Sequence, residues 1–170
     1  MFRRFQSTLS TVQNQALADA YLSHKNAEGV VKTHYINGRF ENIYLPREQL
    51  PNLSQLLDEA VNYAFQILEN KNKKPLKVGF WFNEMQAGHS TSAHTHEEDD
   101  ELLSGVYYIS VPKESGDLVL GDVSKGGKRI YIIPKEGEFI FFSPKLLHAV
   151  EENKSSELRL SIGMNFGRLL

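Results

Sequence analysis

Residues 138–151 read Glu-Phe-Ile-Phe-Phe-Ser-Pro-Lys-Leu-Leu-His-Ala-Val-Glu and contain two short runs of strand-forming residues. The first run, Glu138–Phe142, is aromatic and β-branched, and the second, Leu147–Glu151, follows a Ser143-Pro144 turn. Aromatic and β-branched side chains favour a pleated, half-buried surface, whereas a serine followed by a proline favours a turn. This stretch therefore predicts two β-strands joined by a short connection, with His148 on the second strand.

The same pattern of short strands and turns extends from this stretch toward both ends of the chain. Groups of glycine, proline, serine or asparagine separate further strand-forming runs, at residues 77–84, 89–94, 102–111, 117–121, 129–133 and 157–166. About eight strands within about 90 residues are typical of a jelly roll or a related closed sandwich. We therefore predict a double-stranded β-helix, a cupin-like jelly roll, over residues 77–170.

The first 76 residues follow a different pattern. Apolar residues at near three-four spacing predict a modest helix from Ser10 to about His24, and Asn37-Gly38 predicts a tight turn between two short strands. A second helix should begin after Pro51, with a wide apolar stripe formed by Leu53, Leu56, Leu57, Ala60, Val61, Ala64, Phe65 and Leu68. We predict a mainly β, α+β fold in one domain, in which residues 1–76 are a helical N-terminal buttress of the jelly roll.

Composition excludes several classes of protein. The chain of 170 residues fits one domain, and 41% hydrophobic and 24% charged residues are ordinary for a globular protein. A net charge of −2 with no large basic field argues against nucleic-acid binding. The absence of cysteine rules out disulfides, zinc–thiolate sites, iron–sulfur clusters and a cysteine nucleophile.

The sequence also bears on cellular location. No apolar run approaches the roughly 20 residues that a membrane span requires. The first ten residues are basic and rich in hydroxyl groups, which is a faint likeness to a transit peptide, but two arginines are too few to support one. We expect a cytoplasmic protein that does not bind membranes, and a homodimer is compatible with the sequence.

His94-Thr-His96 is a candidate metal-binding motif. Residues two apart on a strand share a face, so both imidazoles can bind one cation. His148 follows about 50 residues later, and in a jelly roll a late strand can lie beside an early one, so His148 can complete the site. Taken separately, the first pair could be surface histidines beside an acidic loop, and His148 could be a core histidine bonded to the backbone.

Arg159-Leu-Ser161 lies on the last long strand, where apolar and other residues alternate. Leu158, Leu160, Ile162 and Met164 should pack outward, so Arg159 and Ser161 should face the barrel interior. A buried arginine requires an anion, and a dicarboxylate is suitable because guanidinium binds carboxylate through two hydrogen bonds. A salt bridge to one of the chain's own carboxylates is the alternative.

These features together resemble the HxD/E…H…R-x-S signature of 2-oxoglutarate/Fe(II) oxygenases, with matching residues at His94, His148, Arg159 and Ser161. More narrowly, the order of motifs resembles a bacterial and phage branch of that superfamily, and the resemblance covers about residues 80–167. It implies Fe(II) as the metal and 2-oxoglutarate as the cosubstrate, with Tyr108 and Asn83 near 2-oxoglutarate. Tyr107 and Tyr108 should alternate faces, so only one of them can point inside. We expect Trp81 to belong to the barrel core.

One position departs from the superfamily pattern. The carboxylate expected two residues after His94 is replaced by His96, and the acidic run Glu97–Glu101 follows at once. Iron oxygenases commonly use two histidines and one carboxylate, although three histidines can also hold a divalent ion. We expect His94, His96 and His148 to be the metal ligands, while a carboxylate of Glu97–Glu101 remains the alternative third ligand.

The resemblance implies an oxidoreductase, a dioxygenase that hydroxylates a substrate and gives succinate and CO2. The sequence does not name the substrate, but the acidic loop argues for a neutral or cationic group, such as a peptide or an amino acid. The alternatives are a cupin-like metal-binding or ligand-sensing module, or a three-histidine dioxygenase independent of 2-oxoglutarate. An inward Arg159 and Ser161 would favour the 2-oxoglutarate enzyme.

Overall fold

The computed structural model describes residues 2–69, 74–96, 100–121 and 127–169. Within them the chain forms two α-helices, one short 3₁₀ helix and eleven β-strands. In chain order these elements are β1 (Arg3–Gln6), α1 (Thr11–His24), β2 (Val31–Ile36), β3 (Arg39–Tyr44), η1 (Arg47–Gln49), α2 (Leu53–Ile67), β4 (Leu76–Met85), β5 (Thr91–His94), β6 (Glu101–Ser110), β7 (Leu118–Leu120), β8 (Ile130–Ile132), β9 (Glu138–Phe142), β10 (His148–Val150) and β11 (Arg159–Arg168).

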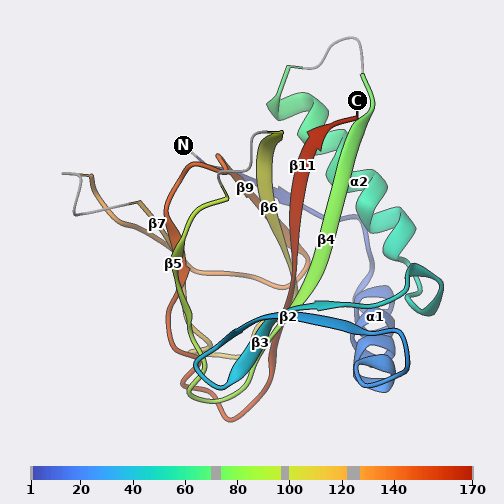
Figure 1. Ribbon diagram of the computed structural model, residues 1–170, viewed down its shortest axis with the longest axis vertical. Helices are drawn as coiled ribbons and strands as arrows, with labels where there is room; N and C mark the ends of the chain where they lie inside the picture. Colours follow the sequence, from blue (N-terminus) through green and yellow to red (C-terminus); the bar gives the residue numbers. More distant parts are fainter. Residues whose placement is uncertain (1, 70–73, 97–99, 122–126, 170) are drawn as a thin grey trace.

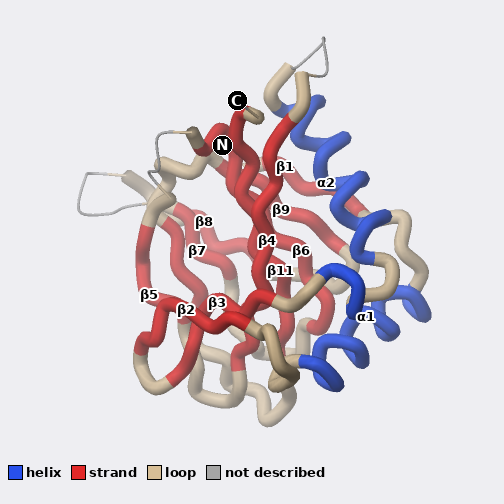
Figure 2. Tube along the Cα trace, turned by 45° about the vertical axis from the view of Figure 1, so that its right-hand side comes forward, coloured by secondary structure: helices blue, strands red, loops and turns tan. Residues whose placement is uncertain are grey.

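The strands form two antiparallel sheets that face each other. The larger sheet has the order β1-β9-β6-β11-β4-β3-β2, and the smaller sheet has the order β5-β10-β7-β8. Figure 1 shows the smaller sheet on the left, the larger sheet in the middle, and both helices against the outer side of the larger sheet. Figure 2, turned by 45°, shows the same helices along one flank of the strands. The predicted jelly roll with a helical buttress is confirmed.

Two apolar layers hold these parts together. The larger one lies between the helices and the outer face of the larger sheet, where α2 contributes a buried stripe: Leu53, Leu56, Leu57, Ala60 and Ala64. The outward residues of β11 join this layer, and they are Leu160, Ile162 and Met164. The smaller layer lies between the sheets and includes Leu118, Leu120, Ile140 and Phe142. The alternation expected along β11 is therefore confirmed, and its other face is left for the space between the sheets.

The segment expected as a helical buttress also supplies strands. The β2–β3 hairpin, whose turn is Asn37-Gly38 as predicted, extends the larger sheet beyond β4. β1 pairs with β9 at the opposite edge, which the sequence did not suggest. Residues before 77 thus add three strands to the sheet in addition to α1 and α2, because both edges of the jelly roll's larger sheet offer unpaired backbone groups.

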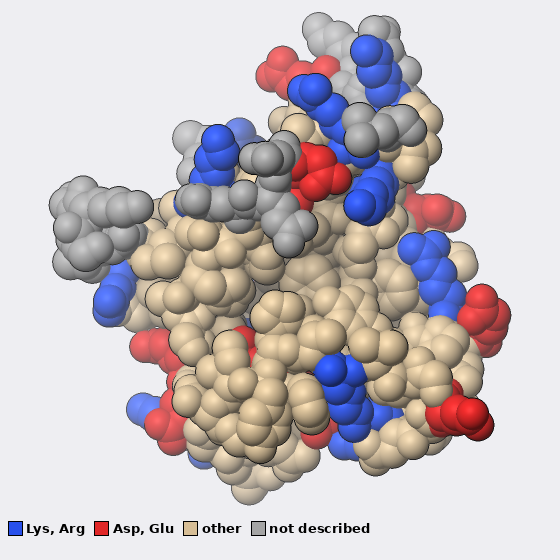
Figure 3. Space-filling model, viewed as in Figure 1, with Lys and Arg blue, Asp and Glu red and all other residues tan. Residues whose placement is uncertain are grey.

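The face seen in Figure 3 carries both basic and acidic side chains, and the centre of this face is largely uncharged. None of the helices among the described residues is long and apolar enough to cross a membrane.

Candidate metal and cosubstrate site

A cavity of about 430 Å³ lies between the two sheets. Its walls come from the inner faces of β4, β6 and β11 on one side, and from β5 and β10 on the other. The structure brings all seven of the predicted site residues to this cavity: Asn83, His94, His96, Tyr108, His148, Arg159 and Ser161. A cavity of this size is within the range of small-molecule sites in proteins.

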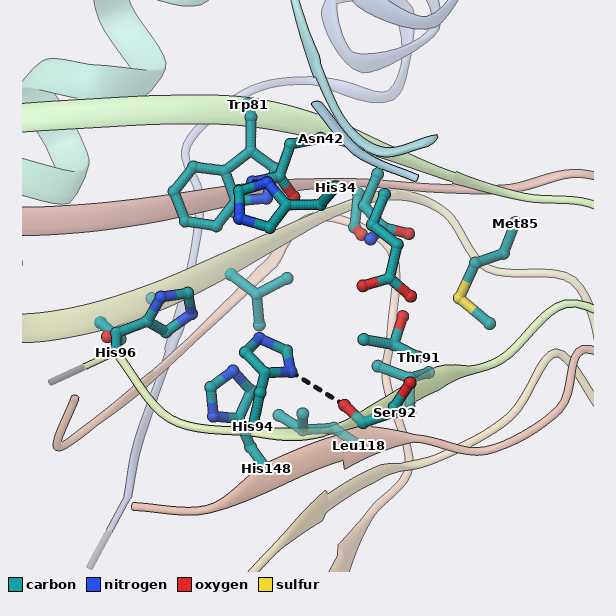
Figure 4. Close-up of a pocket in the computed structure, with 18 of the residues that line it drawn as sticks. His34, Asn42, Trp81, Met85, Thr91, Ser92, His94, His96, Leu118 and His148 are labelled. Carbon is teal, nitrogen blue, oxygen red and sulfur yellow. Dashed lines mark hydrogen bonds between the residues drawn. The ribbon is translucent and has the colours of Figure 1, made fainter. Parts of the chain in front are cut away.

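Three histidines converge on the wall made by the smaller sheet. His94 ends β5 and is the direct cross-strand partner of His148, which begins β10. One ligand atom of each of His94, His96 and His148 lies within 4.8 Å of the others. Figure 4 shows the three rings grouped on one side of the cavity, with Trp81 and His34 across from them. Three imidazole nitrogens at this separation can surround one divalent ion.

Backbone hydrogen bonds orient two of the rings. His94 Nδ1 lies 2.8 Å from the Ser92 carbonyl oxygen, and His148 Nδ1 lies 3.0 Å from the Leu146 carbonyl oxygen. A carbonyl oxygen can only accept, so each Nδ1 donates and each Nε2 keeps a free lone pair. Such hydrogen bonds fix the tautomer that binds a metal.

Burial keeps two of the three histidines, His96 and His148, neutral. Burial, followed by the charge of the neighbouring His94, lowers the pKa of His148 to about 3 and that of His96 to about 4. Neutral imidazole is the form that binds a metal. His96 and His148 are therefore in the metal-binding form near neutral pH.

The described acidic residues next to the cluster have other partners. Asp100 Oδ2 lies 3.8 Å from Lys77 Nζ, and Glu101 Oε1 accepts a hydrogen bond from Asn165 Nδ2 at 2.5 Å. Among the described residues, the histidine trio is the group able to hold a metal ion. Residues 97–99 lie outside the described residues, and they include three of the alternative ligands, Glu97, Glu98 and Asp99.

Arg159 occupies a different part of the same cavity and is only 2% exposed. Its Nη1 donates to the carbonyl oxygens of Ser115 and Gly116 at 3.1 and 2.9 Å. Its Nε is buried without a hydrogen-bond partner, and within the described residues no carboxylate lies within 4.0 Å of the guanidinium. The alternative of a salt bridge to the chain's own carboxylate is thus absent from this part of the chain, and burial lowers the pKa of Arg159.

Tyr108 is the inward member of the tyrosine pair. Its ring centroid lies 5.5 Å from the Arg159 guanidinium carbon, and its buried hydroxyl has no hydrogen bond of standard geometry. Burial raises the pKa of Tyr108 to about 12, so the hydroxyl remains a donor at neutral pH. Tyr107 points the other way and donates to Asn14 Oδ1 at 2.8 Å.

The cavity floor is a regular grid on three neighbouring strands. On β11, the inward residues are Ser161, Gly163 and Asn165. Their partners on β4 are Asn83, Trp81 and Gly79, and their partners on β6 are Tyr108, Val106 and Ser104. The floor therefore has a polar end beside Arg159, a middle row of Trp81, Gly163 and Val106, and a second polar end at Asn165 and Ser104.

Several residues that approach the site were missed from the sequence. Trp81 lines the cavity and is not part of the core, since its ring lies over Gly163. His34 lines the cavity from β2, in a left-handed conformation with φ of 57°, and its Nδ1 contacts Thr33 and Asn42. A left-handed backbone at a residue other than glycine costs energy and is often found at functional sites. The Asn37-Gly38 turn predicted the hairpin, but nothing in the sequence indicated that the hairpin would reach the cavity.

Arg39 and Glu41 form a second buried polar pair that the sequence analysis also missed. They are 7% and 6% exposed, and Arg39 Nη2 lies 3.2 Å from Glu41 Oε1. The same guanidinium donates to Asn83 Oδ1 at 3.4 Å and to Thr91 Oγ1 at 2.9 Å. Arg39 thus joins the N-terminal hairpin to the strands that carry Asn83 and His94.

Comparison with known families and structures agrees with this geometry. Residues 79–165, just over half of the chain, match the sequence profile of a family described as "Putative 2OG-Fe(II) oxygenase". No curated protein sequence matches the chain.

Solved structures share the fold at low identity. A Pseudomonas putida prolyl-4-hydroxylase is 17% identical with a TM-score of 0.77, and the match covers 99% of this chain and 93% of that chain. The non-heme alpha ketoglutarate dependent carbocyclase SnoK from nogalamycin biosynthesis is 16% identical with a TM-score of 0.78, over 98% of this chain and 79% of that chain. A 2OG complex of the collagen prolyl hydroxylase of Paramecium Bursaria Chlorella virus-1 is 17% identical with a TM-score of 0.63, over 99% and 96%.

Proposed function

This chain belongs to the 2OG-Fe(II) oxygenase family and is an enzyme that depends on Fe(II) and 2-oxoglutarate, and we propose that it hydroxylates a C–H bond of a peptide or an amino acid. One observation carries the proposal: the convergent histidines and the buried Arg159 line a single cavity. A metal and a dicarboxylate can therefore be held close to each other and to a substrate.

The metal ligands in this proposal are His94, His96 and His148. The donor set fits Fe(II), since imidazole nitrogen suits divalent iron and the three ligand atoms lie within 4.8 Å of one another. His96 takes the place of the more common carboxylate. The hydrogen bonds from His94 and His148 to backbone carbonyls hold those two rings in the metal-binding tautomer.

The 2-oxoglutarate ligands in this proposal are Arg159, Ser161, Tyr108 and Asn83. The buried and unpartnered Nε of Arg159 is the strongest support, because an arginine that is 2% exposed gains most from a carboxylate partner. The neighbouring hydroxyls of Tyr108 and Ser161 can donate to the same carboxylate. Arg39 keeps the Asn83 side chain in place from the other side.

Together, Fe(II) and 2-oxoglutarate supply O2-dependent chemistry that yields succinate, CO2 and a hydroxylated product. The protein's own residues bind, orient and exclude water. The two sheets enclose the reacting groups, and Trp81, Val106 and Leu118 give the cavity an apolar lining. The high pKa of Tyr108 keeps its proton available as a hydrogen-bond donor throughout.

A peptide or an amino acid is the proposed substrate class because of the charges around the histidines. Asp100 and Glu101 lie near the cavity on the His96 side, and a negative field disfavours polyanions such as nucleic acid. A dioxygenase that works without 2-oxoglutarate, or a sensing module, would have no need for a buried Arg159 facing the cavity.

Calorimetric titration of 2-oxoglutarate into the metal-free and the Mn(II)-loaded protein tests the proposal. We expect binding to require or to be strengthened by Mn(II), because the cosubstrate would contact both Arg159 and the metal. We also expect the Fe(II)-loaded protein to release succinate when 2-oxoglutarate is added under air. If 2-oxoglutarate binds neither form, the proposal is wrong and a three-histidine site without this cosubstrate takes its place.

A further inference from the structure

We propose that Ser104 and Asn165, at the end of the cavity floor opposite Arg159, bind an N–H-bearing group of the primary substrate, either a primary amide or an ammonium group. This inference rests on the proposed function, because it names what occupies the part of the cavity that 2-oxoglutarate would not fill. It assigns a ligand to the second polar end of the floor.

Both residues present polar atoms that have no partner among the described residues. Ser104 is 1% exposed, lines the cavity, and its Oγ makes no hydrogen bond. Asn165 Oδ1 is also buried without a hydrogen bond. The two residues are direct cross-strand partners on β6 and β11, so their side chains stand side by side on the inner face. Unsatisfied buried polar atoms are rare in proteins, and two adjacent ones in a cavity indicate a ligand.

The orientation of the Asn165 amide determines which chemistry it recognises. Its Nδ2 donates to Glu101 Oε1 at 2.5 Å and lies 3.5 Å from His96 Nδ1. A carboxylate can only accept, so the amide nitrogen must face Glu101 and the oxygen must face the cavity. The ligand therefore has to donate, and a group with two N–H hydrogens can donate to both Asn165 Oδ1 and Ser104 Oγ.

The surroundings favour the same kind of ligand. The neighbouring indole of Trp81 offers an aromatic surface, which attracts N–H groups and cations. Glu101 lies directly behind Asn165, and Asp100 lines the adjacent outer cavity. The contact between Asn165 and His96 places the bound group beside the three histidines, so an adjacent C–H bond would lie close to the metal.

A second cavity adjoins this end of the floor. It has a volume of about 290 Å³, is lined in part by Gly79, and shares His34, Asn42, Trp81, His96 and Asn165 with the first cavity. Gly79 is the cross-strand partner of Asn165, and a Cβ built there meets nothing within 4 Å. The Gly79→Val variant should therefore fold normally and narrow the second cavity beside Asn165.

The test uses small probes, since the primary substrate is unidentified. Benzamide, benzylammonium and N,N-dimethylbenzamide share a ring that can rest on Trp81, but the last of them has no N–H. Their dissociation constants can be measured by chemical-shift titration against the Zn(II)-loaded protein, with and without 2-oxoglutarate. We expect benzamide or benzylammonium to bind at least about fivefold more tightly than N,N-dimethylbenzamide, as one or two hydrogen bonds would provide. Tighter binding of benzamide would identify the substrate group as a primary amide, and tighter binding of benzylammonium would identify it as an ammonium group.

Three variants locate the binding. Ser104→Ala and Gly79→Val should each weaken the better probe about fivefold while 2-oxoglutarate affinity, measured by calorimetry, stays within about twofold. Ser110→Ala removes a serine hydroxyl from the same strand outside the cavity and should change neither constant. Ser104→Ala should not lower the melting temperature, since it removes a buried hydroxyl that has no partner.

The outcomes separate this inference from the proposed function. Failure of 2-oxoglutarate to bind would contradict the function, while the probe comparison would still decide whether this end of the floor is an N–H site. Equal binding of all three probes, or full probe binding by Ser104→Ala and Gly79→Val, would overturn the inference even if 2-oxoglutarate binds as proposed.

Discussion

Replacing Arg159 by methionine is the sharpest test of the cosubstrate end of the cavity. Methionine has a similar length but no charge and no donors. Each hydrogen bond to a charged partner contributes about 1.5–3 kcal/mol, so losing a contact of two such bonds should cost at least about 3 kcal/mol. We therefore expect 2-oxoglutarate affinity to fall about 100-fold or more, because each 1.4 kcal/mol is a factor of about 10.

The effect on the fold should be smaller. The variant leaves the carbonyl oxygens of Ser115 and Gly116 without the Arg159 donor, which destabilises the protein. It also removes a buried charge, whose cost is evident from the lowered pKa of Arg159. These two effects oppose each other, and replacing buried charged groups with apolar ones is often close to neutral. Arg159→Lys should retain part of the affinity for 2-oxoglutarate, since lysine keeps the positive charge but cannot bind a carboxylate in the bidentate way of arginine.

Calorimetry with the Mn(II)-loaded protein measures the change, and bound metal per chain shows that the histidine cluster is intact. Arg168→Met is a suitable control, because Arg168 is an exposed arginine on the same strand. Unchanged 2-oxoglutarate affinity in Arg159→Met, with normal metal content and normal circular dichroism, would refute the assignment of Arg159.

Three further changes test the rest of the site. His96→Ala should lower metal affinity at least about 10-fold, whereas His96→Asp should keep it. Alanine substitutions at residues 97–99 should have little effect on metal affinity. The metal content of these variants shows whether His96 or a carboxylate of residues 97–99 is the third ligand. The pKa of His148 is lowered to about 3 in the folded protein. Below about pH 6.5, His148 is therefore protonated in the unfolded chain but stays neutral in the folded protein. Metal-free protein should therefore lose roughly 2 kcal/mol of stability from this group between pH 6.5 and 5, and urea unfolding of His148→Gln should show a weaker loss. Gly163→Ala would place a Cβ 2.5 Å from the Trp81 ring, so the ring must move, and the emission of this single tryptophan should shift.

The jelly roll and the site's main residues were predictable because they depend on strand periodicity. Alternation along residues 158–165 separates Arg159 and Ser161 from the apolar set, and a spacing of two places His94 and His96 on one side. Such local rules hold wherever a strand has one buried face. They also explain why Tyr108, and not Tyr107, faces the cavity.

The contribution of the N-terminal segment was not predictable by the same reasoning. β1 is a short, charged segment, and it becomes a strand only because the edge of β9 offers it backbone partners. The burial of Arg39 depends on Glu41 and on groups of β4 and β5 that are distant in sequence. No periodic pattern marks a polar residue whose partners all come from tertiary contacts, and His34 reaches the cavity only through a left-handed backbone.

In the proposed site, His96 stands where a ligand carboxylate is more common, which would change the charge balance, and Glu101 offers a compensation. In that site the charges of Fe(II) and of the two carboxylates of 2-oxoglutarate would cancel, so a ligand set without a carboxylate would leave the charge of Arg159 unbalanced. Arg39 and Glu41 neutralise each other. Glu101 accepts a hydrogen bond from the Asn165 amide, and Asn165 Nδ2 lies 3.5 Å from His96 Nδ1. The negative charge of Glu101 is therefore separated by one residue, Asn165, from the position that a ligand carboxylate would occupy. In the proposed site, Glu101 would therefore contribute through its field and through Asn165 without being a ligand.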